Sequence, residues 1–126
     1  MTLLGGTAAT WPLAVRGQRG RDPNINIGVL TDMSGLFATL AGEGSVVAAN
    51  MAVEDFGGDA LGSKIRVFFA DHKHKVDVAS AIATQWFNEA HVGAVVDMPN
   101  STVALAMQKL ADAHGRIAIT ISGGTS

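Results

Sequence analysis

The sequence predicts an α/β fold in which a parallel sheet carries helices on both faces. Two observations predict it. Four short apolar, β-branched runs suit buried strands, and in the three longer segments between them apolar residues recur every three or four positions. The elements therefore alternate, with three strand–helix units followed by a fourth strand. Right-handed crossovers make such strands parallel and place the helices on both sides of the sheet.

The first strand and the first helix follow Pro23. Residues 25–31 are β-branched and apolar and lie between turn-forming residues, which suits a buried strand. From about Ala38 to Phe56 apolar residues recur at helical spacing, and the glycine pair that follows Phe56 ends the pattern. This stretch predicts a helix of the first crossover.

The later elements repeat this order. Residues 65–70 are the second predicted strand, and Asp77 is expected to cap the second helix. A third strand over residues 94–97 leads through a short loop with a capping residue into the third helix, which Gly115 terminates. Residues 117–121 are the fourth strand.

The composition limits the classes of function. A chain of 126 residues suffices for one domain with a real core, and 48% hydrophobic against 16% charged residues predicts a packed fold. The 11 acidic and 9 basic residues are scattered and give a net charge of -2, so nucleic acid is not an expected partner. The lack of cysteine excludes disulfides, thiolate metal sites and a thiol nucleophile.

Residues 1–20 differ from the rest and are expected to be an export signal or a leader. They are small and apolar as far as Val15, contain no acidic residue and end in a basic stretch. A short apolar region followed by small residues is the anatomy of an export signal. No basic residue precedes Leu3, so either the true start lies upstream of Met1 or the segment is a disordered leader.

Ligands of open parallel sheets bind beyond the carboxyl ends of the strands, where loops meet helix N-termini. Residues 32–37, 71–74, 99–102 and 122–126 follow the four predicted strands. Three of these four segments are rich in serine, threonine and glycine. The pattern favours a site that binds a small molecule by hydrogen bonds.

Ser101 and Thr102 begin the third helix, so their hydroxyls and the free amides there are candidates for holding a carboxylate or another anion. The alternative is simple capping. Gly123 and Gly124 would let the backbone approach a ligand while Thr125 donates a hydrogen bond, the alternative being a flexible turn.

Ser34 and Phe37 follow the first strand and are further candidates for ligand contacts. Asp32, Ser34 and Gly35 are equally ordinary turn residues, so both interpretations stay open.

Catalysis and metal binding find little support in the sequence. The histidines at 72 and 74 lack a third ligand at metal spacing, and a lysine-flanked pair is typical of a solvated turn. The sequence contains no G-x-x-x-x-G-K-[ST] loop and no serine in a nucleophile elbow. No catalytic residue, metal or cofactor is therefore expected.

The order of several motifs resembles one family. Residues 27–35 (IGVLTDMSG), 51–58 (MAVEDFGG), 101–106 (STVALA) and 122–126 (SGGTS) resemble the periplasmic solute-binding proteins of ABC importers, and the branched-chain amino acid (leucine-binding) type fits best. The likeness covers essentially everything after Pro23. It implies a type I lobe of α/β architecture, two such lobes that close on a small solute, and a membrane permease as partner.

The resemblance also implies roles for single residues. Ser101 and Thr102 match the first-lobe residues that hold the solute's carboxylate or amine, and Gly123 to Thr125 match a second such loop. Phe37 falls where many members carry an aromatic residue. Because members are several times longer, residues 24–126 would be only the first part of the N-terminal lobe, a truncated product or fragment that is not binding-competent alone.

Two other functions remain open on the sequence alone. A ligand-sensing domain of a receptor would share the fold, and a small intracellular α/β enzyme or signalling domain would use the leader as part of the fold. The solute is not identified either, since amino acids, amides and aromatic acids all suit such a half-site.

Overall fold

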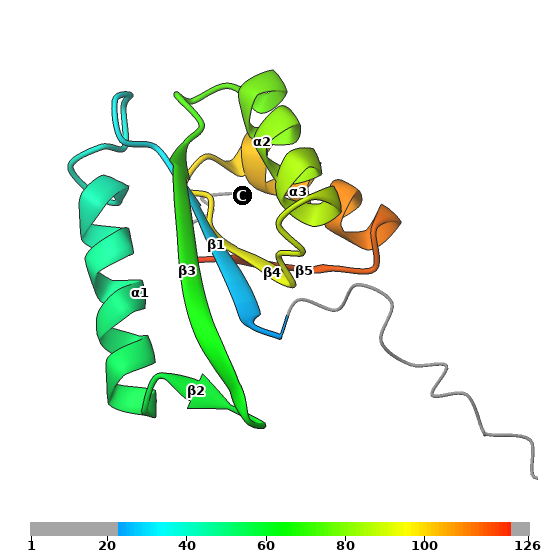
Figure 1. Ribbon diagram of the computed structural model, residues 1–126. Helices are drawn as coiled ribbons and strands as arrows, with labels where there is room; N and C mark the ends of the chain where they lie inside the picture. The colour runs from blue at the N-terminus through cyan, green and yellow to red at the C-terminus, as the bar shows by residue number, and fades with distance from the viewer. Residues whose placement is uncertain (1–22, 122–126) are drawn as a thin grey trace, which may run out of the picture.

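The computed structural model describes residues 23–121. In chain order the elements are β1 (Ile25–Thr31), α1 (Gly42–Phe56), β2 (Asp59–Ala60), β3 (Ser63–Asp71), α2 (Val76–Asn88), β4 (Ala94–Asp97), α3 (Ser101–Ala113) and β5 (Ile117–Thr120). The strands form one sheet in the order β2-β3-β1-β4-β5, with α1 on one side and α2 and α3 on the other (Figure 1).

The long strands are all parallel. β1 lies between β3 and β4, β5 pairs with β4, and only the two-residue β2 is antiparallel, where it pairs with the start of β3. The predicted fold class, a parallel α/β sheet with helices on both faces, is confirmed. Among residues 23–121 no helix has both the length and the apolar character needed to cross a membrane.

Three predicted details are wrong. The first helix begins at Gly42 instead of near Ala38, because Ala41 has the non-helical angles φ -130° and ψ -106°. Asp77 does not cap the second helix, which begins one residue earlier, after the extended Lys75, so Asp77 lies within the first turn. The prediction also lacks β2, since two residues carry no strand pattern.

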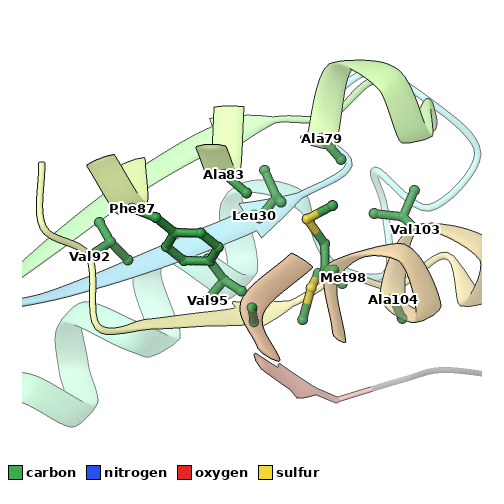
Figure 2. Close-up of a cluster of buried hydrophobic side chains, with 11 residues drawn as sticks. Leu30, Ala79, Ala83, Phe87, Val92, Val95, Met98, Val103 and Ala104 are labelled. Atoms are coloured by element: carbon green, nitrogen blue, oxygen red, sulfur yellow. The ribbon is translucent and has the colours of Figure 1, made fainter. Parts of the chain in front are cut away.

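The apolar core lies between the sheet and the pair α2 and α3 (Figure 2). Its buried members are Leu30, Ala79, Ala83, Phe87, Val92, Val95, Met98, Val103, Ala104, Met107 and Ala111. Trp86 packs against this cluster and lies directly on β1, where a Cβ on Gly28 would collide with its ring. The absence of a side chain at Gly28 is therefore what lets α2 approach the central strand.

The opposite side of the sheet is less completely covered. Side chains alternate along a strand, so Val29 points away from the core that contains Leu30, as do its register neighbours Phe69 and Val96. α1 packs on β1 and β3, and of its own residues only Gly42 is buried. Ile119, the next residue in this row, is 51% exposed.

Candidate ligand-binding site

Three loops meet where the parallel strands end. Thr31 is in register with Asp71, and Leu30 is in register with Asp97, so β1, β3 and β4 finish side by side. The following loops, residues 32–41, 72–75 and 98–100, therefore lie at one edge of the sheet, which we call the carboxyl edge. Of the candidate residues within the described part of the chain, Ser34 and Phe37 lie in the first of these loops, and Ser101 and Thr102 begin α3 directly after the third.

A buried carboxylate shapes the first loop. Asp32 is fully buried, and its Oδ1 accepts a hydrogen bond from the Gly35 amide (2.7 Å) while its Oδ2 accepts one from the Phe37 amide (3.1 Å). A Cβ on Gly35 would come within 2.6 Å of both carboxylate oxygens, so only glycine lets the loop wrap this closely. The turn interpretation of this motif is therefore correct for Asp32 and Gly35, and the wrapped loop sets the position of Phe37.

A second carboxylate joins the first loop to the second. Asp71 accepts hydrogen bonds from the amides of Met33 (3.0 Å) and Lys73 (2.7 Å) and from the Ser34 hydroxyl (2.6 Å). Burial raises the pKa of Asp71, but the hydrogen bonds from Ser34, Met33 and Lys73 outweigh it, and the pKa lies below its usual value. Because the Ser34 hydroxyl donates to Asp71, Ser34 has only its oxygen lone pairs left to offer a ligand.

The third loop leads into α3, and its capping residue is Asn100. The Asn100 Oδ1 accepts hydrogen bonds from the amides of Thr102 (2.8 Å) and Val103 (3.1 Å). Ser101 and Thr102 do not cap the helix, so their hydroxyls are not used for that purpose. Two of the amides that the sequence suggests for an anion are occupied, and the Ser101 amide is left without a partner among residues 23–121.

The two histidines of the second loop differ in burial: His74 lies in an exposed turn, as predicted, and His72 does not. His72 is fully buried, and its Nδ1 accepts a hydrogen bond from the His74 amide (3.1 Å), which places the ring proton on Nε2. Burial lowers the pKa of His72, more strongly than the nearby carboxylates Asp32 and Asp71 raise it. His72 is therefore a neutral residue of the interior, and the prediction of a solvated turn is wrong for it.

His74 is partly exposed and lies between the other two loops. Its ring stacks on that of Phe37, with 5.5 Å between the ring centres and 25° between the planes. Its Nδ1 is 3.5 Å from Asp32 Oδ2, and the side-chain Nδ2 of Asn100 is 2.8 Å from its Nε2. The sequence prediction placed His74 and Asn100 in the segments 71–74 and 99–102 that follow two strands, but it named neither as a site residue.

Some candidates lie elsewhere. Gly123, Gly124 and Thr125 are outside the described residues. Within residues 23–121 no group of three or more histidine, cysteine, aspartate or glutamate side chains is arranged to hold a metal ion. The described part of the carboxyl edge thus offers hydroxyls, one helix-terminal amide and an aromatic pair, which suit hydrogen bonding and packing to a small polar molecule.

Comparison with known proteins extends this description. A periplasmic binding protein of Burkholderia mallei is 39% identical with a TM-score of 0.77, over 79% of this chain and 27% of that one. A branched-chain amino acid ABC transporter periplasmic ligand-binding protein of Burkholderia xenovorans LB400 is 42% identical with a TM-score of 0.76, over 79% and 26%. A branched-chain amino acid transporter substrate-binding protein of Streptococcus pneumoniae, solved with isoleucine, is 28% identical with a TM-score of 0.70, over 79% and 29%.

The chain thus spans between a quarter and a third of the length of these structures. No curated protein matches it. The family model for periplasmic binding proteins matches residues 24–126, which is most of the chain. With that match and the likeness to the Burkholderia structures, the chain belongs to the periplasmic binding protein family, a family of solute-binding proteins rather than of enzymes.

Proposed function

We propose that residues 24–126 are the first part of the N-terminal lobe of a solute-binding protein of an ABC importer, of the branched-chain amino acid type. The observation that carries the proposal is the 42% identity to a branched-chain amino acid ABC transporter periplasmic ligand-binding protein. In this proposal residues 1–20 are an export signal, the protein works in the periplasm, and its partner is a membrane permease.

The carboxyl edge supplies the first half of the solute site. The Ser101 amide and the Ser101 and Thr102 hydroxyls lie at the N-terminus of α3, where a carboxylate is favoured by the helix dipole. Phe37 packs against the solute's apolar part, and Ser34 accepts a hydrogen bond from a donor on it. Gly123, Gly124 and Thr125 form the second polar loop of the same site.

The solute is a small organic acid of the size of an amino acid, its amide or an aromatic acid. A single edge can cover a small molecule on one side only, whereas ligand sites usually bury most of their ligand's surface. We therefore expect the 126-residue chain to bind such a solute weakly or not at all. A full-length protein with both lobes should bind it with micromolar affinity or better.

Titration calorimetry on the protein purified from periplasmic extract tests the proposal, with leucine, leucinamide and benzoate as probes. Ser101→Ala removes one hydroxyl hydrogen bond and should weaken binding by about two- to tenfold, since such a bond contributes about 0.5–1.5 kcal/mol. Ser63→Ala is the matched control, because Ser63 begins β3 at the opposite edge of the sheet.

Other outcomes would contradict the proposal. Recovery of the intact protein in the cytosol, with residues 1–20 still attached, would favour a small intracellular α/β domain. Micromolar binding of leucine to the 126-residue chain itself would show that one edge suffices and would overturn the expectation that the longer protein is needed.

A further inference from the structure

One side chain of the second loop touches residues of the other two loops. The His74 ring stacks on Phe37 of the first loop with a centre-to-centre distance of 5.5 Å, and its Nδ1 lies 3.5 Å from the buried Asp32. The side-chain Nδ2 of Asn100, in the third loop, lies 3.3 Å from Nδ1 and 2.8 Å from Nε2. His74 is separated from Phe37 and Asn100 by 37 and 26 residues, so this contact is purely tertiary.

The backbone adopts an unfavourable shape to put His74 there. Lys73 and His74 have φ values of 52° and 58°, in the left-handed region that residues with a Cβ rarely adopt. Short local bonds hold this shape: the Lys73 amide donates to Asp71, the His74 amide to the His72 ring, and the Lys75 amide to the His72 carbonyl. Strain of this kind persists only where surrounding contacts fix it, and it concentrates at functional sites.

The two partners of His74 are themselves fixed at their far ends. The Phe37 amide donates to Asp32, so the backbone beneath the Phe37 ring is set by a buried carboxylate. The Asn100 Oδ1 accepts from the first-turn amides of α3, which leaves the Asn100 amino group to face His74. His74 therefore closes a chain of contacts from the first loop to the N-terminus of α3.

We propose that His74 is a positioning residue for the solute site: its ring holds Phe37 and the first turn of α3 at a fixed separation. The inference rests on the proposed function, because those two elements are the ones assigned to the solute. His74 acts through them and does not itself need to touch the solute.

Two substitutions separate the two contacts of the ring. His74→Asn removes the ring, and asparagine tolerates the left-handed backbone. His74→Phe keeps a ring for Phe37 to stack on but removes the nitrogens near Asn100 and Asp32. His91→Asn is the matched control, because His91 is exposed, has φ 50° and lies between α2 and β4 at the opposite edge of the sheet.

Nuclear magnetic resonance on the solute-free, full-length protein detects the contact of His74 with Phe37 and its contact with Asn100. The Phe37 ring protons should move toward their random-coil shifts in His74→Asn and stay near their wild-type values in His74→Phe. Amide exchange at Thr102 and Val103 should speed up several-fold in His74→Phe, because the Asn100 cap loses its support. His91→Asn should change neither readout.

Calorimetry on the same variants completes the test. We expect both His74 variants to bind the best of the three probe solutes about two- to tenfold more weakly, and His91→Asn to bind it as wild type does. Unchanged Phe37 shifts in His74→Asn together with unchanged Thr102 exchange in His74→Phe would overturn the inference, as would lost contacts with unchanged affinity. Failure of the proposed function differs: the unsubstituted protein then binds no probe, while the resonance data still decide whether His74 joins the two elements.

Discussion

The two sides of the sheet differ in how they are packed. On the side of α2 and α3 the apolar side chains are buried, and Phe87 is only 2% exposed. On the side of α1, Phe56 is 67% exposed, and Ile117 and Ile119 of the edge strand β5 are more than half exposed. Exposed apolar surface on this scale is typical of a face that another segment or molecule covers. The difference teaches that the stability of the described chain comes mainly from one side of its sheet.

A matched pair of phenylalanines gives the largest expected contrast. Phe87→Ala in α2 should lower the free energy of unfolding by about 3–5 kcal/mol, because it leaves a cavity in the core. Phe56→Ala at the end of α1 should cost about 0.5 kcal/mol, since most of the side chain is already in water. Urea unfolding of the two variants measures both changes, and losses of equal size would refute the comparison.

Substitutions of two glycines, one on each side of the sheet, should change the free energy of unfolding by intermediate amounts. Gly28→Ala should destabilise by about 1–3 kcal/mol, because the new methyl group overpacks against Trp86. The cost should shrink when Trp86→Leu is present, which a double-mutant cycle detects. Gly44→Ala on the opposite side meets nothing within 4 Å and should stabilise α1 by up to about 1 kcal/mol. A Gly28→Ala variant as stable as wild type would show that α2 can move away from β1.

The smallest effect concerns pH and His72, the buried histidine that follows β3. Burial lowers the pKa of His72, so the unfolded chain takes up a proton more readily than the folded one. Its contribution to stability is therefore complete above the unfolded pKa of about 6.5 and is lost as the pH falls from there through the lowered folded pKa.

Urea midpoints measured across that window in wild type and His72→Gln check this prediction. The wild-type midpoint should fall with pH more steeply than that of His72→Gln. Equal slopes in wild type and His72→Gln would contradict it.

The sequence predicted the fold well because the relevant signals are local. β1 and β4 match the predicted residues 25–31 and 94–97, since buried parallel strands appear as short apolar runs. Asp77 failed as a cap because a capping preference is weak beside the extended backbone of Lys75, which fixes the start of α2. β2 was not predicted because its pairing with Ser63 and Lys64 depends on a hairpin rather than on its own composition.

The site was predicted less completely because its arrangement is tertiary. Position after a strand end pointed to Phe37 and Ser101, and both lie at the carboxyl edge, Phe37 in the first loop and Ser101 at the start of α3. The same rule could not reveal that Asn100 takes two of the first-turn amides of α3, or that His74 packs between Phe37 and Asn100. Such contacts join residues far apart in the chain and follow from the register of the strands.

In the proposed solute site, the carboxylates of Asp32 and Asp71 have a consequence for the kinetics of solute binding. They accept hydrogen bonds from the Phe37 and Met33 amides and from the Ser34 hydroxyl, so the loop is already ordered before a solute arrives. The loop loses its conformational entropy during folding, so solute binding does not have to order it. The loop is therefore preorganised for binding. Removing the hydrogen bonds of either carboxylate should therefore leave the association rate almost unchanged and shorten the residence time of the bound solute.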